Sequence, residues 1–214
     1  MTLNIKKTHS ERLMPLLDGM LTESGIDREE IDAIAAAAGP GSFTGLRIGV
    51  ATARALAQAL GIPAVAVNTL EALAEAVPAP GALICPLLDA RRSQVYTALY
   101  RRSHQPPYEL ETLIEPGAID LSELVETLQN RDQPVVFLGE GLHTCAAELT
   151  AALPANRAVI TLAPFRLCRA ALVTLCGRRL LHLNPNASYR ELLPVYLRRP
   201  EAERLADERQ GGSK

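Results

Sequence analysis

The sequence contains no tryptophan, and aromatic residues make up only 4% of its 214 residues. Proteins that bind single-stranded nucleic acid by base stacking need several exposed rings, so this composition disfavours that class. The formal net charge is −2, with 22 basic and 24 acidic side chains. The chain therefore has no overall positive field that would attract RNA, and any action on RNA would need positive charge from another molecule.

Long apolar runs and paired metal ligands are also missing. No stretch reaches the roughly 18 apolar residues of a membrane span, and the first residues contain no signal-peptide core. The four cysteines form no C-x-x-C pair and the four histidines no H-x-x-x-H spacing. We therefore expect free thiols, no metal, no cofactor, no membrane association and a cytoplasmic location.

The remaining pattern alternates between strand and helix, which predicts an α/β fold. Strands are expected at residues 3–7, 31–40, 62–68, 82–89, 94–102, 134–141 and 158–162, and helices at 8–24, 42–60, 68–77, 121–129, 144–153 and 164–183. The segment PAPG (78–81) is the clear linker. It divides the chain into an N-terminal lobe (1–79) and a C-terminal lobe (80–206), followed by a disordered tail (207–214).

The stretch GPGSFTG (39–45) is a glycine-rich turn that opens a helix, and such turns often hold phosphates. A Walker loop is excluded because Leu46 stands where its lysine would be, and the dinucleotide fingerprint fails because Gly45 comes one residue late. We interpret the segment as a structural loop, in which glycines permit a tight turn from strand to helix. Its members are Gly39, Pro40, Gly41, Ser42, Thr44 and Gly45.

The helix behind this loop is apolar on more than one side. Its polar strip consists only of Arg47, Arg54 and Gln58. One apolar face can pack on a sheet, and the other needs a second helix or a partner protein. The pattern fits a neighbour such as the helix at 8–24 and a partner protein equally well.

The segments THSERLMPLLDGML, GPGSFTGLRIGVATARALA, IPAVAVNTLEALA, LLDARRSQVYTALY, VVFLGEGL and LLPVYLRRP carry a family resemblance. Over nearly the whole chain, the sequence resembles the TsaB (YeaZ) family of bacterial tRNA threonylcarbamoyladenosine biosynthesis proteins. The resemblance implies the two-lobed actin/Hsp70-like ATPase (ASKHA) fold. It also implies a non-catalytic scaffold that binds the catalytic paralogue TsaD and, with the ATPase TsaE, supports modification of tRNA.

The same resemblance assigns a partner interface to the first two helices. It comprises Leu13, Leu16, Leu17, Met20, Arg47, Val50, Ala51 and Arg54. It implies that tRNA is reached only through the complex, and that the free protein could form a homodimer through the same helices.

A nucleotide site is expected to be degenerate. By resemblance, the metal-binding histidines of the paralogue align with Thr69 and Leu73, which cannot replace them. The glycine of an Asp-x-Gly hairpin is replaced by Arg91 in Asp89-Ala90-Arg91, and the adenosine-side glycines are echoed only by Gly139 and Gly141.

Family members begin with a β-hairpin that carries an I-x-x-D-T-S-like segment, and the resemblance starts here at what corresponds to their third strand. We therefore expect an incomplete N-terminal lobe with an exposed sheet edge, caused by truncation or a misassigned start codon.

Two enzymatic alternatives remain. An ATP-dependent phosphotransferase of the same fold would use Asp89, although Arg91 beside it argues against this activity. A glycoprotease-like peptidase would need a triad such as His9, Ser10 and Glu11. Adjacent residues at a helix start point in different directions, so helix capping explains this triplet better.

Overall fold

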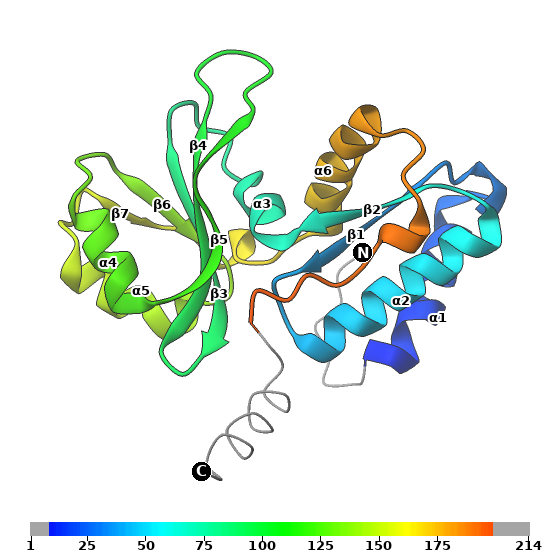
Figure 1. Cartoon of the computed structure of the whole chain (residues 1–214), viewed down its shortest axis with the longest axis horizontal. Coiled ribbons are helices and arrows are strands. Elements are labelled where there is room, and N and C mark those ends of the chain that lie inside the picture. Colours follow the sequence, from blue (N-terminus) through cyan, green and yellow to red (C-terminus); the bar gives the residue numbers. More distant parts are fainter. Residues whose placement is uncertain (1–8, 199–214) are drawn as a thin grey trace, which may run out of the picture.

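The computed structural model describes residues 9–198, which form two β-sheets with helices around them (Figure 1). The predicted α/β fold is confirmed. The expected strand at 3–7, the first residue of the helix expected at 8–24, and the tail at 207–214 lie outside the described residues. The first sheet pairs two parallel strands, β1 (Ile34–Gly39) and β2 (Ala64–Asn68). The second has five strands in the order β5-β4-β3-β6-β7.

The first sheet is built mainly from alanine and valine, and its side chains alternate between two faces. Ile34, Ala36 and Ala38 face helix α2 (Phe43–Leu60), whereas Ala35 and Ala37 pack with helix α6 (Ala170–Leu183). The two helices therefore cover opposite faces of β1 and β2 (Figure 1). The contact with α6 is close, because a Cβ at Gly177 would lie 2.3 Å from the Cβ of Ala35.

The second sheet also buries both faces. Its strands are β3 (Leu83–Arg91), β4 (Gln94–Arg102), β5 (Leu110–Asp120), β6 (Val135–Leu138) and β7 (Ala158–Ile160). One face packs on α4 (Leu121–Gln129) and α5 (Leu142–Ala152), around Leu87 and Phe137. The other packs on the short helix α3 (Thr69–Ala74), around Ile84 and Leu138.

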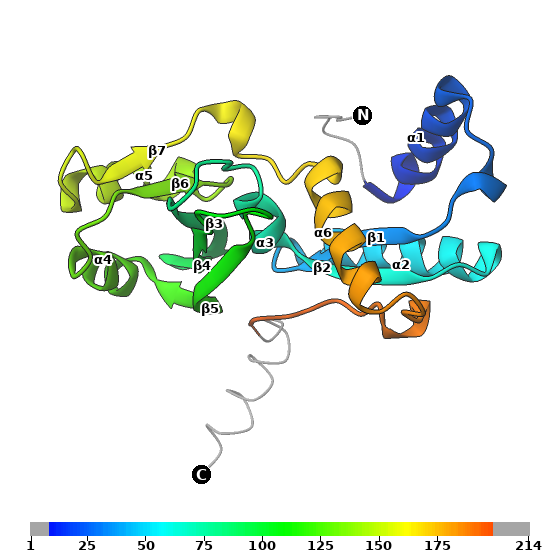
Figure 2. The same ribbon diagram turned by 90° about the horizontal axis from the view of Figure 1, so that it is seen from above.

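Helix α1 (His9–Ser24) precedes a short 3-10 turn, η1 (Arg28–Glu30). It ends as predicted at Ser24 and is followed by Gly25, whose φ is +65°. The helix contacts α2 but stands away from the first sheet (Figure 2). No side chain from Glu11 to Ser24 is buried, although leucine and methionine recur along the helix.

One strand was not predicted, and two predicted helices need correction. The unpredicted strand is β5, because Pro116 and Gly117 interrupt its pattern; it forms because β4 offers an antiparallel partner. Helix α3 ends at Ala74 rather than near Val77. The last long helix begins at Ala170 rather than near Pro164, because residues 163–165 form a separate 3-10 turn, η2 (Ala163–Phe165).

Helix α6 follows the second sheet in the sequence but packs on the first, whereas the sequence pattern grouped it with residues 80–206. The segment after it contains the 3-10 turn η3 (Tyr189–Glu191) and passes to the α2 face of the first sheet, where Leu192 is buried with Val50 and Ala57. The chain therefore crosses between the sheets twice within residues 9–198.

Candidate protein-interaction site

Helix α2 presents one exposed stripe to the surface. The stripe repeats every three or four residues, as one face of a helix requires, and consists of Thr44, Arg47, Ala51, Ala55 and Gln58. The opposite side of the helix is buried at Val50, Ala53 and Ala57. We call the exposed set the α2 stripe; its side chains are small or polar, with Arg47 as its only charge.

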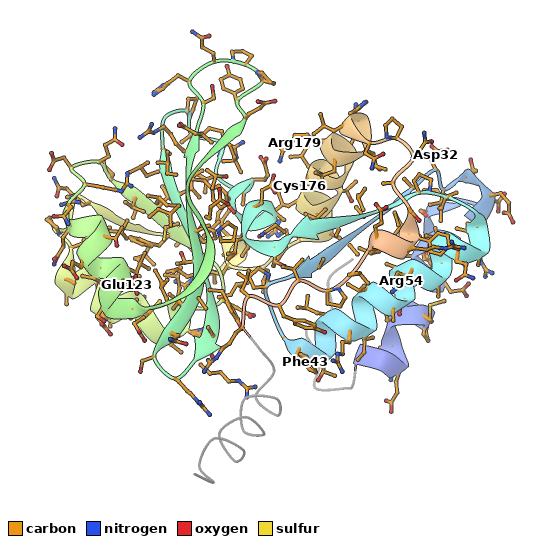
Figure 3. The ribbon with its side chains drawn as sticks, viewed as in Figure 1. Asp32, Phe43, Arg54, Glu123, Cys176 and Arg179 are labelled. Atoms are coloured by element: carbon orange, nitrogen blue, oxygen red, sulfur yellow. The ribbon has the colours of Figure 1, made fainter. Side chains whose placement is uncertain are left out.

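Four predicted interface residues belong to α2, and the structure separates them. Arg47 and Ala51 lie on the α2 stripe, and Arg54 is half-buried farther along the helix (Figure 3). Val50 is only 2% exposed and packs against the first sheet. It therefore cannot contact a partner, because it lies on the same side of the helix as Ala53 and Ala57.

The other four predicted interface residues lie on α1. Leu13, Leu16 and Leu17 are half-buried, and Met20 is 38% exposed. Met14, outside the predicted set, is 48% exposed. The apolar face of α1 is thus only partly covered by the described chain, and it lies next to α2.

An aromatic cluster at the start of α2 escaped the sequence analysis. The guanidinium carbon of Arg47 lies 3.9 Å from the centre of the Phe43 ring, and Nε of Arg47 donates to Oη of Tyr196 at 3.0 Å. The rings of Phe43 and Tyr196 lie 5.1 Å apart. Phe43 and Arg47 are four residues apart, and this spacing places two side chains next to each other on a helix, so their contact was detectable from the sequence. Nothing in the sequence connects Tyr196 with them.

The GPGSFTG loop is held by its own backbone and by the C-terminal segment. Ser42, rather than Thr44, caps α2: its Oγ accepts from the backbone N–H of Gly45 at 3.4 Å. Gly39 has a φ of +134°, and a Cβ there would lie 2.3 Å from the carbonyl oxygen of Val195. Only glycine fits this position, because both the backbone conformation and the contact exclude a side chain.

The loop faces the β3–β4 hairpin across a cleft of about 550 Å³. The structure thus places Asp89 and the glycine-rich loop on the same cleft, although they lie far apart in the sequence. The lining residues are Pro40, Gly41, Ser42, Phe43, Thr44, Leu46, Asp89, Ala90, Arg91, Arg92, Tyr96, Glu140, Val195, Tyr196, Leu197 and Arg198.

Two charged side chains of this cleft help to hold the hairpin. Oδ1 of Asp89 accepts from the backbone N–H of Arg91 at 2.6 Å, and Nη1 of Arg198 donates to the carbonyl of Ala90 at 2.8 Å. The glycines at 139 and 141 fit tightly against β3: a Cβ at Gly139 would lie 2.2 Å from the carbonyl oxygen of Leu87. Close packing therefore explains both glycines without a nucleotide.

Nucleophiles and metal ligands are poorly placed for chemistry. Burial raises the pKa of Cys85 and Cys176 to about 12, and that of Cys145 and Cys168 to about 11, so all four thiols are protonated at neutral pH. Within residues 9–198, no group of three or more His, Cys, Asp or Glu side chains could hold a metal ion. Thr69 and Leu73, aligned with the paralogue's histidines, are both buried.

No helix within the described range has the length and apolar character needed to cross a bilayer.

Comparisons with known proteins agree with this architecture. The family model described as TsaD, tRNA N6-adenosine threonylcarbamoyltransferase, matches residues 4–205. The chain is 42% identical over 135 residues to a tRNA threonylcarbamoyladenosine biosynthesis protein TsaB from Bacillus subtilis, and 36% identical over 140 residues to the one from Escherichia coli. Each match covers 63% of this chain and 58% of the relative, so the chain spans well under two thirds of their length.

A solved structure shares the fold over a larger part of the chain. YeaZ from Pseudomonas aeruginosa superposes with a TM-score of 0.72 at 25% identity, over 91% of this chain and 87% of YeaZ. This agreement supports the predicted two-lobed ASKHA fold. The chain therefore belongs to the family of the matched model, and within that family it is a TsaB/YeaZ protein.

Proposed function

We propose that this protein is a non-catalytic scaffold in the biosynthesis of threonylcarbamoyladenosine in tRNA, and that it binds a TsaD-type transferase through α1 and the α2 stripe. The observation that carries the proposal is the incomplete burial of the apolar side chains of α1. Its apolar residues recur at helical spacing, yet no side chain from Glu11 to Ser24 is buried. An amphipathic helix of this kind needs a further surface to cover its apolar face.

A paralogous partner fits the comparison with the family model. That model describes the transferase, and it matches nearly the whole of this chain. The two proteins would therefore share a fold and carry equivalent helices, which could pack together as a helical bundle. In this proposal TsaE and tRNA join through the complex, in the cytoplasm, and the free protein can pair with itself through the same helices.

The chemistry of the cleft supports the non-catalytic role. Phosphoryl transfer needs carboxylates that hold a metal ion beside the phosphates. Within residues 9–198 Asp89 belongs to no group of three or more side chains that could hold one, and one of its oxygens accepts from the backbone N–H of Arg91. The cleft itself favours the alternative of an ATP-dependent phosphotransferase, since it joins the loop to Asp89. We rank this alternative second because the cleft holds no group of three or more metal-binding side chains within residues 9–198.

Reconstitution tests the proposed function. The TsaD-type transferase and the TsaE ATPase encoded in the same genome are incubated with tRNA, threonine, bicarbonate, ATP and a threonylcarbamoyl-AMP synthase. One reaction contains this protein and the other does not. We expect modified adenosine, measured by mass spectrometry of nucleosides, only when this protein is present. Equal yields without it would contradict a scaffold role. Modification by this protein without the transferase would show that it is the catalyst.

A further inference from the structure

We infer that Arg47 is a preorganised receptor for a carboxylate of the docking partner, and that Tyr196 is the positioning residue that holds it. The inference rests on the proposed function and adds to it a specific contact and a residue from outside the two helices. It is carried by the geometry of the cluster of Phe43, Arg47 and Tyr196.

Two contacts fix the plane of the Arg47 guanidinium. The Phe43 ring stacks against it at 3.9 Å, and Oη of Tyr196 accepts from Nε at 3.0 Å. The two rings also contact one another. A long flexible side chain on an exposed helix face would otherwise lose much rotamer entropy on binding, and these contacts reduce that loss before the partner arrives.

The same contacts leave both Nη groups of Arg47 available. Within residues 9–198, no carboxylate lies within ion-pair distance of Arg47, and its only hydrogen bond is the one from Nε to Tyr196. A guanidinium whose two Nη groups are unpaired can bind a carboxylate in bidentate fashion.

The surroundings favour a protein carboxylate over an RNA phosphate. The other members of the α2 stripe carry no charge, and the nearby Phe43 and Val195 are 37% and 45% exposed. Exposed aromatic, aliphatic and arginine side chains in one patch are typical of protein–protein hot spots. An RNA backbone would need several cations in a row along the α2 stripe, whereas Arg91, Arg92 and Arg198 line the adjoining cleft and not the stripe.

The test measures affinity for the purified TsaD-type transferase of the same genome by titration calorimetry. The first variant is Arg47→Lys, which keeps the positive charge but loses the planar guanidinium that stacks on Phe43. The second is Tyr196→Phe, which keeps the ring but loses the hydroxyl that accepts from Arg47. We expect about tenfold weaker binding for Arg47→Lys and about threefold for Tyr196→Phe. The double variant should bind no more weakly than Arg47→Lys, since Tyr196 acts through Arg47.

The matched control is Arg178→Lys, an exposed arginine on α6, which covers the opposite face of the first sheet. It should bind as the wild type does, and thermal unfolding should show all variants equally folded. Wild-type affinity in Arg47→Lys, or additive losses in the double variant, would overturn the inference while leaving the proposed function standing. A wild-type protein that does not bind the transferase would overturn both. Loss of tRNA binding by Arg47→Lys, with unchanged affinity for the transferase, would assign the site to phosphate instead.

Discussion

The backbone N–H of Val195 donates to the carbonyl oxygen of Ala38 at 2.7 Å, which ties the C-terminal segment to the end of β1. The contact lies directly before the glycine-rich turn. Two residues of the same segment extend it: Tyr196 accepts from Arg47, and Arg198 donates to Ala90 on the second sheet. Residues 195–198 therefore connect the loop, the start of α2 and the β3–β4 hairpin.

Replacing Gly39 with alanine should loosen this connection. The alanine would have to adopt a φ of +134°, and its Cβ would lie 2.3 Å from the carbonyl oxygen of Val195. We expect a loss of about 1–3 kcal/mol in the free energy of unfolding, measured by urea denaturation. Gly41→Ala is the control, because its nearest neighbour lies at 3.8 Å and its φ is not positive. Equal stability of the two variants would contradict this account of the loop.

A buried ion network joins the second sheet to α3 and α6. Nη1 of Arg102 lies 2.8 Å from Glu75, and the side chains are 7% and 5% exposed. Glu75 and Glu71 also pair with Arg179 on α6 (Figure 3). Arg102 donates further to the carbonyls of Val77, Ala74 and Tyr108, so four of its five N–H groups are used.

Arg102→Met should therefore be strongly destabilising, by about 3–5 kcal/mol, because it leaves Glu75 buried with less compensation. Urea denaturation measures the loss. The neighbouring Arg101→Met is a matched control: its pair with Glu111 is 3.5 Å long and exposed, so its removal should cost less than about 1 kcal/mol. Similar losses in the free energy of unfolding for both variants would show that burial does not determine how much these ion pairs contribute to stability.

Much of the fold followed from the sequence, for physical reasons that particular residues illustrate. The helix ends at Ser24 and Leu60, each followed by a glycine with positive φ, and the tight turn at Gly39 depend on local backbone chemistry, so they were predictable. Asn68 caps α3 near the expected start of that helix, whereas Glu71 pairs with Arg179, 108 residues away. Tertiary partners of this kind leave no local signal.

The candidate site was predictable only in outline. The surplus apolar character of α2 indicated a second contact surface, but periodicity could not decide which side faces the sheet. Val50 was therefore placed at the interface although it is buried, while Tyr196 was missed. The predicted partner, and the pairing of helices with it, stay predictions.

The cysteines should resist labelling in the native protein. Their pKa values of about 11 to 12 keep them protonated at pH 8, and the thiolate is the reactive form. Because the pKa is raised, labelling by a disulfide reagent should accelerate about tenfold per pH unit from pH 7 to 10. Four thiols should react rapidly in denaturant. Fast native labelling at pH 7 would contradict the burial of these residues.

Magnesium–ATP should bind no more than weakly and should not be hydrolysed by the pure protein, because Asp89 belongs to no group of three or more metal-binding side chains within residues 9–198. Calorimetry and a phosphate-release assay measure this. Saturable binding that is lost in Asp89→Asn would revive the phosphotransferase alternative. Asp32→Asn serves as the control, since this exposed carboxylate lies before the other end of β1 (Figure 3).

Recovery of the TsaD-type transferase on the tagged protein tests the proposed interface most directly. Ala51→Arg places a charged side chain on the exposed α2 stripe, and Ala147→Arg places the same side chain on the exposed face of α5. Both variants should fold, since neither alanine is buried. We expect recovery of the transferase to fall about tenfold or more with Ala51→Arg and to match the wild type with Ala147→Arg. Equal recovery with both variants would contradict docking through α2.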